Sequence, residues 1–312
     1  MNDKYREIAR KMRGPLAPIM TPFDEQDQVD HESLRRWVDW LVSQDVPVLW
    51  TTGGTSEMLA LTEQEVFGLT GTVCEANAGR AFLIASTPPL WQADKAIELV
   101  KFAQRAGATA VKVQLNWQGG PKPNEVFDYY RRVADVTDMP ILVYTVGQPG
   151  MSVDLLVRLA EAIPQVIGIK NDTDDCYLHT AYLEALPEDF GVLTGGMQRP
   201  MVLGYHFGQR CYADAYAMFA PHVAWSFFNS LEQGDVVAAV DVIRQYEIPW
   251  SDLLIFGRRK LDSKATMKTV LWLTGHFETN RVRFPRTSFD PGGAEVDLVR
   301  QFLQQVGVET VR

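Results

Sequence analysis

The chain has 312 residues, of which 46% are hydrophobic and 22% are charged, which is enough apolar material for a large core. A formal net charge of −9 argues against a nucleic-acid or an anionic-membrane partner. The polar first residues lack the apolar segment of a signal peptide, and the three cysteines are far apart in the sequence. We therefore expect a cytoplasmic protein with incidental thiols and no metal site.

Short apolar runs alternate with amphipathic stretches of helical length along the first two thirds of the chain. Eight such runs, separated by helices, predict an α/β fold in which a parallel sheet closes as a (β/α)8 TIM barrel. An open doubly wound sheet is the alternative, but no glycine-rich phosphate loop follows the first run. The expected strands are 16–20, 46–50, 81–85, 110–115, 141–144, 166–170, 191–193 and 211–213, and the expected helices between them are 31–43, 63–75, 93–105, 124–136, 152–162, 174–186 and 197–207.

Residues that typically begin and end helices support these boundaries. Thr62 and Glu65 have the spacing of a capping box, and Gly107 is placed to end a helix. We expect the barrel core over 1–221, with the last barrel helix and a helical C-terminal extension over 222–312 as part of the same structural unit. The helices expected in that second part are 223–233, 236–245, 263–273 and 294–306.

Two candidate catalytic residues end neighbouring strands, at the edge where α/β barrels carry their active sites. Lys170 ends the run 166–170, and a partly buried amine there can attack a carbonyl carbon. Tyr144 ends the preceding strand, where a phenol can transfer a proton to or from a substrate oxygen. The alternatives are a lysine that extends into solvent and a tyrosine that packs on the barrel rim.

The loop after the second strand, 53–57, is a candidate carboxylate-binding site. Its small residues include Gly54 and Thr55, which offer backbone N–H groups and a hydroxyl to an anion. A tight turn that needs glycine is the alternative. An amine, a phenol and an anion-binding loop at one barrel edge together suit a 2-keto acid, with an imine at the ketone and hydrogen bonds to the carboxylate.

Two further residues have less specific interpretations. Trp117 follows the fourth strand and is interpreted either as a wall over an organic substrate or as an interface aromatic. Lys112 lies in the middle of the fourth strand, below the barrel mouth, so we expect it to have a structural role.

The chain resembles the dihydrodipicolinate synthase and N-acetylneuraminate lyase superfamily of Schiff-base class I aldolases and dehydratases, from about residue 14 to 221. The resemblance implies that Lys170 forms an imine and that Tyr144 relays protons. It also implies that Gly54 and Thr55 are the pair that holds the substrate carboxylate. The matching segments are 18–23, 53–57 with 61–62 and 65, 106–108, 140–144, 168–170 and 193–195.

The differences from the synthase are as informative as the matches. Gly54 has no hydroxyl, so the threonine–tyrosine proton relay of the synthase is incomplete. The synthase's tyrosine pair falls on Trp117 and Gln118, and its substrate-gripping arginine has no equivalent in 145–150. These differences argue against synthase activity and favour a sugar-acid branch such as 5-dehydro-4-deoxyglucarate dehydratase. That match is partial, because Ser56 stands where the dehydratase has glycine.

We therefore expect a lyase, aldolase or dehydratase, that forms a Schiff base with pyruvate or a 2-keto-3-deoxy sugar acid through Lys170 and Tyr144, without a metal or other cofactor. The expected substrate-binding residues are Gly54, Thr55, Trp117 and Gln118. The resemblance implies a homo-oligomer, either a tetramer or a dimer. A non-catalytic sensor or scaffold that binds a 2-keto acid is the first alternative. A metal-dependent barrel lyase is the second, and the absence of a His/carboxylate cluster at the strand ends weighs against it.

Overall fold

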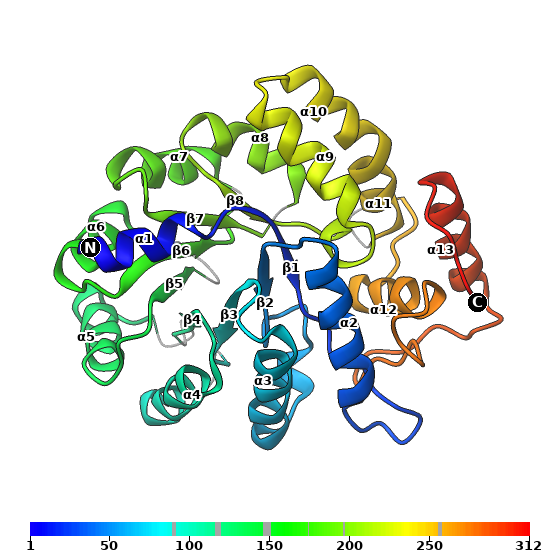
Figure 1. Ribbon diagram of the computed structural model, residues 1–312, viewed down its shortest axis with the longest axis horizontal. Helices are drawn as coiled ribbons and strands as arrows, with labels where there is room; N and C mark the ends of the chain where they lie inside the picture. Colours follow the sequence, from blue (N-terminus) through cyan, green and yellow to red (C-terminus); the bar gives the residue numbers. More distant parts are fainter. Residues whose placement is uncertain (89–91, 116–119, 146–150, 174, 196, 255–257) are drawn as a thin grey trace.

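The computed structural model describes residues 1–88, 92–115, 120–145 (145 in its backbone), 151–173, 175–195, 197–254 and 258–312. Within them, parallel strands form a closed barrel in the order β1 to β8, and β1 pairs with β8 to close it (Figure 1). The predicted (β/α)8 barrel is therefore confirmed. The strands are β1 (Gly14–Pro18), β2 (Val48–Trp50), β3 (Phe82–Ser86), β4 (Ala110–Val113), β5 (Ile141–Thr145), β6 (Val166–Asn171), β7 (Gly191–Thr194) and β8 (Cys211–Ala213).

One helix follows each strand and packs on the outside of the barrel (Figure 1). The predicted boundary signals are present: Thr62 and Glu65 form a capping box, and Gly107 ends its helix in the left-handed conformation with φ of 95°. The helices are α2 (His31–Ser43), α3 (Glu63–Asn77), α4 (Ala93–Ala106), α5 (Pro123–Ala134), α6 (Val153–Ala162), α7 (Cys176–Ala185), α8 (Gln198–His206) and α9 (Pro221–Glu232).

The rest of the chain forms the expected helical extension, which packs on the α2 side of the barrel (Figure 1). The helix expected over 236–245 ends earlier, because a π-helical turn, η3 (Ile243–Glu247), interrupts it. Pro249 follows this turn and has no N–H to donate into it, which favours a break in the regular hydrogen-bond ladder. The helices of the extension are α10 (Val236–Val242), α11 (Ile248–Leu253), α12 (Ser263–Leu273) and α13 (Ala294–Gln305).

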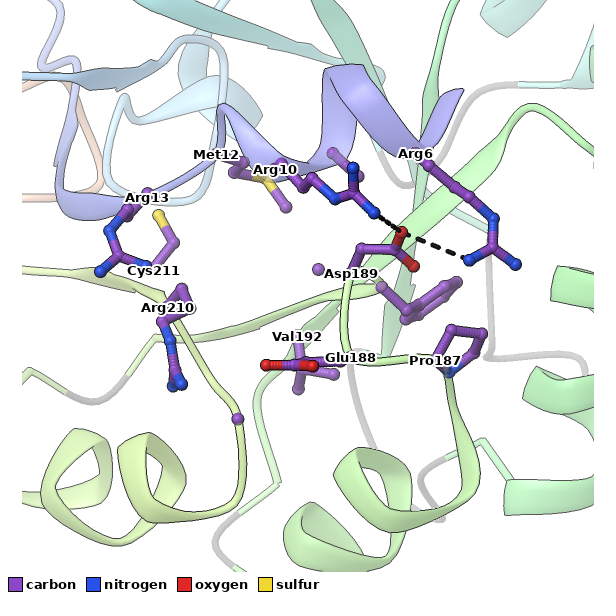
Figure 2. A pocket seen from close by; sticks show the side chains of 14 residues that line it. Arg6, Arg10, Met12, Arg13, Pro187, Glu188, Asp189, Val192, Arg210 and Cys211 are labelled. Carbon is purple, nitrogen blue, oxygen red and sulfur yellow. Dashed lines mark hydrogen bonds and ion pairs between the residues drawn. The ribbon is translucent and has the colours of Figure 1, made fainter. Parts of the chain in front are cut away.

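A short N-terminal helix, α1 (Asp3–Arg10), which the sequence pattern did not predict, covers the amino ends of the strands. Its buried Tyr5 and Ala9 pack with side chains of the barrel interior. Figure 2 shows Arg6 and Arg10 of α1 beside the carboxylate of Asp189, at 3.4 and 3.2 Å. These contacts fasten α1 to the segment before β7. A cavity of about 450 Å³ lies there, at the end of the barrel opposite the strand ends that carry Lys170 and Tyr144.

The described helices are too short or too polar to cross a membrane.

Candidate active site

Lys170 and Tyr144 lie side by side at the carboxyl ends of β6 and β5, where they pair directly in the strand register. The side chain of Lys170 is only 3% exposed, and Tyr144 is also buried. The structure therefore brings the two predicted catalytic residues together, and Lys170 does not extend into solvent.

Asp172, which follows β6 directly, joins these two residues and was given no role on the basis of the sequence. One carboxylate oxygen, Oδ1, forms an ion pair with Nζ of Lys170. The other, Oδ2, accepts a hydrogen bond from the Tyr144 hydroxyl at 2.5 Å. Asp172 lies one residue beyond β6, so strand periodicity does not place its side chain.

Burial and the neighbouring charges set the protonation states of Asp172 and Tyr144. Burial alone would raise the pKa of Asp172, but the neighbouring Lys170, the Tyr144 hydroxyl and Lys112 together hold it below its usual value. Burial and the nearby Asp172 carboxylate raise the pKa of Tyr144. The site thus holds an ionised carboxylate and a protonated phenol at neutral pH.

Gly195, just beyond β7, leaves the space that the lysine and the aspartate occupy. A Cβ atom at this position would lie 2.5 Å from Nζ of Lys170 and would also overlap Oδ1 of Asp172. Real Cβ atoms do not approach other heavy atoms this closely. A larger residue here would therefore force the ends of these two side chains to move.

Lys112 of β4 is a second buried amine next to the site. Its Nζ lies over the rings of Trp50 and Tyr144, at 4.3 and 3.8 Å from their centroids. Within the described part of the chain, this Nζ has no hydrogen-bond partner. Burial, followed by the charge of Lys170, lowers the pKa of Lys112 well below that of an ordinary lysine. The lysine begins in the middle of its strand, as expected, but its amine reaches the Tyr144 ring.

The 53–57 loop presents two adjacent backbone N–H groups. The N–H groups of Gly53, Ser56 and Glu57 form hydrogen bonds inside the loop, whereas those of Gly54 and Thr55 have no partner among the described residues. Gly54 is exposed and a Cβ added to it would meet nothing within 4 Å. The pair predicted to hold a carboxylate therefore has the donors that this role needs.

Contacts to distant segments hold this loop in place. The side chain of Glu57 forms an ion pair with Lys268 of α12, at 2.9 Å, and both side chains are at most 1% exposed. The backbone N–H of Arg283 donates to the other oxygen of Glu57 at 3.1 Å. Burial lowers the pKa of Lys268 to about 8, although the adjacent Glu57 acts in the opposite direction. The C-terminal extension therefore fixes the loop that offers the Gly54 and Thr55 N–H groups.

A cavity of about 210 Å³ lies between the 53–57 loop and the segment after β7, because Thr55 and Gly195 both line it. Most of its other walls are apolar side chains of β1, of the segment after β8 and of the C-terminal extension, including Met218 and Trp250.

Two predicted substrate-binding residues, Trp117 and Gln118, lie outside the described residues, as do positions 146–150. Among the described residues, no group of three or more His, Cys, Asp or Glu side chains is arranged to hold a metal ion.

Comparison with known proteins connects this geometry to a protein family. The family model described as the Dihydrodipicolinate synthetase family matches residues 11–296. A 4-hydroxy-tetrahydrodipicolinate synthase of Chlorobium luteolum is 29% identical over 76% of this chain and 80% of the relative. A probable 5-dehydro-4-deoxyglucarate dehydratase of Xanthobacter autotrophicus is 26% identical over 87% of this chain and 89% of the relative.

Solved structures match over almost the whole chain. Dihydrodipicolinate synthase of Aquifex aeolicus superimposes with a TM-score of 0.83 at 21% identity, over 96% of this chain and 100% of that protein. A prophage protein of E. coli K12 from the dihydrodipicolinic acid synthase family, solved in complex with pyruvate, gives 0.84 at 21% identity, over 95% and 99%. At such low sequence identity, these structural similarities show the shared fold alone.

Proposed function

Because the chain belongs to the dihydrodipicolinate synthetase family, we propose that it is a lyase that forms a Schiff base with a 2-keto acid. The observation that carries this proposal is the convergence of Lys170, Tyr144 and Asp172 at the carboxyl ends of β5 and β6. A buried amine with adjacent proton-transfer groups is the arrangement that nucleophilic catalysis by lysine needs.

In this proposal the substrate carboxylate binds the N–H groups of Gly54 and Thr55. Nζ of Lys170 attacks the ketone carbon, and the Tyr144 hydroxyl donates a proton to the oxygen that leaves as water. The resulting protonated imine withdraws electrons from the neighbouring carbon, which allows loss of water or cleavage of a carbon–carbon bond. The lysine supplies this electron sink itself, so the reaction needs no metal or diffusible cofactor.

The substrates that we propose are pyruvate and 2-keto-3-deoxy sugar acids. Support comes from the similarity to the Xanthobacter dehydratase and from the pyruvate complex of the E. coli K12 protein. Gly54, which carries no hydroxyl for the synthase relay, argues against synthesis of dihydrodipicolinate. We further propose that the chain forms a homo-oligomer, a dimer or a tetramer, which sedimentation analysis would test.

Borohydride trapping tests the central step. The wild-type protein, incubated with pyruvate or a 2-keto-3-deoxy sugar acid and then reduced, is expected to gain the mass of the reduced adduct at one lysine. Peptide mapping must place the adduct on Lys170 and not on Lys112, the second buried amine of the site. Lys170→Ala is the control and should gain no mass. A folded wild-type protein that traps no 2-keto acid would refute the proposal.

A non-catalytic keto-acid sensor is the second candidate function, because Gly54 leaves the synthase-type relay incomplete. The two candidates predict different behaviour of Lys170→Ala. Binding of pyruvate that survives this substitution, together with absence of turnover by the wild-type protein, would favour the sensor.

A further inference from the structure

The Tyr144 hydroxyl has an unusual partner for a proton relay in this site. The resemblance places the missing relay hydroxyl at position 54, where this chain has glycine. The structure instead shows the hydroxyl donating to Oδ2 of Asp172 at 2.5 Å. A carboxylate therefore occupies the position next to Tyr144 in the hydrogen-bond chain.

The same carboxylate contacts the amine that must lose a proton before it can attack. Oδ1 of Asp172 is paired with Nζ of Lys170, and both atoms lie next to Gly195, within 2.5 Å of where a Cβ at that residue would be. The Asp172 side chain is 30% exposed and that of Lys170 only 3%, so the carboxylate is the more accessible member of the pair. Asp172 thus contacts both Lys170, which must lose a proton, and Tyr144, which delivers a proton to the substrate.

We infer that Asp172 is the proton-transfer residue of this site: it accepts a proton from the Lys170 ammonium and returns it through Tyr144 to the ketone oxygen. This inference rests on the proposed function. The lysine ammonium carries three protons, of which two leave with the ketone oxygen as water and one stays on the imine nitrogen. Asp172 takes the first proton, and the nitrogen–carbon bond then forms as the carbonyl π bond opens, with the oxygen protonated by Tyr144 and Tyr144 reprotonated by Asp172. Asp172 carries the second proton from the carbinolamine nitrogen by the same route, the carbon–oxygen bond breaks as water leaves, and Asp172 ends as a carboxylate beside the protonated imine.

The charge balance of the site agrees with this assignment. Among the described residues, Lys170, Tyr144 and Lys112 lower the pKa of Asp172, and together they outweigh the effect of its burial so that the carboxyl stays ionised. An ionised carboxylate can accept the proton, and it also stabilises the positive charge that the imine retains.

Asp172→Asn tests the inference, because it keeps the shape of the side chain and removes its basicity. With pyruvate, and with each 2-keto-3-deoxy sugar acid tested, we expect the rate of imine trapping at pH 7 to fall by about 100- to 10,000-fold. The rate of the variant should then rise with pH, as solvent deprotonates the amine in place of Asp172, whereas the wild-type rate should depend little on pH. Asp172→Glu, which retains a carboxylate, should recover part of the rate and the flat pH profile.

The control removes the same charge from a neighbour outside the site. Asp175 caps α7 by accepting hydrogen bonds from the backbone N–H groups of Tyr177 and Leu178, a role that asparagine also fills. Asp175→Asn should therefore trap pyruvate at the wild-type rate. Circular dichroism checks folding, and Asp172→Ser removes the carboxylate if the asparagine variant does not fold.

The outcomes separate this inference from the proposed function. A wild-type protein that traps no 2-keto acid would overturn both. A wild-type protein that traps at Lys170, with an Asp172→Asn variant of the same rate and pH profile, would overturn the role of Asp172 alone. Slow trapping by Asp172→Asn that recovers at high pH would support it.

Discussion

The buried ion pair between Glu57 and Lys268 gives a prediction of large magnitude. Both side chains are at most 1% exposed, and Lys268 also donates to the carbonyl of Arg281 at 2.7 Å. Lys268→Met leaves the Glu57 carboxylate buried without its cation. Breaking a buried pair in this way costs about 3–5 kcal/mol, and an exposed pair contributes only about 0–1 kcal/mol. We therefore expect Lys268→Met to lower the free energy of unfolding by about 3–5 kcal/mol.

Urea unfolding, followed by circular dichroism and by tryptophan fluorescence, measures this loss. The matched control is Arg35→Met, which breaks a pair between two helices whose partners, Arg35 and Glu75, are 48% and 70% exposed. The double variant Lys268→Met/Glu57→Gln should recover most of the stability, because no charge then stays buried. Equal losses for Lys268→Met and Arg35→Met, or no recovery in the double variant, would refute the reasoning.

Three further predictions concern Lys112, His276 and Gly195. Lys112→Met should stabilise the protein at pH 7 by about 1–3 kcal/mol, because it removes a buried amine that has no hydrogen-bond partner among the described residues. Since the pKa of Lys112 is lowered in the folded state, that gain should shrink as urea unfolding is repeated toward pH 10.5, the ordinary lysine value. Burial lowers the pKa of His276 from 6.5 to about 4, so up to about 3 kcal/mol of stability should be lost as pH falls through this range. His276→Phe should show a shallower loss in acid-unfolding curves, and an unchanged curve would contradict this. Gly195→Ala should slow imine trapping about 100-fold by displacing the Lys170 amine, whereas Gly292→Ala, where a Cβ meets nothing within 4 Å, should trap normally.

The sequence predicted the barrel because local periodicity carries most of the information about a repeated strand–helix unit. The bounds of α2, α12 and β8 agree with the structure to the residue. Helix α1 was missed because it is short and only Tyr5 and Ala9 of its residues are buried. A periodic pattern needs more positions than these to stand out from polar sequence.

In the site, too, the residues set by local pattern were predicted, and those set by other contacts were missed. Lys170 and Tyr144 could be placed side by side because consecutive strands are neighbours in a barrel. The role of Asp172 depends on how the chain leaves β6, which strand periodicity does not specify. The contact between Glu57 and Lys268 depends on where the C-terminal extension folds back, and no local pattern reports that path. The parts of the site that were missed are therefore those made by tertiary contacts.

The link between the 53–57 loop and the C-terminal extension has a consequence for the order in which the protein matures during synthesis. Chains are made from the N-terminus, so the loop emerges from the ribosome long before Lys268 and Arg283 do. The barrel can close once β8 has been made, yet Glu57 still lacks its two partners at that stage. A nascent chain that stops before Lys268 would thus contain Lys170 and the 53–57 loop, but it would lack both contacts that hold this loop in place.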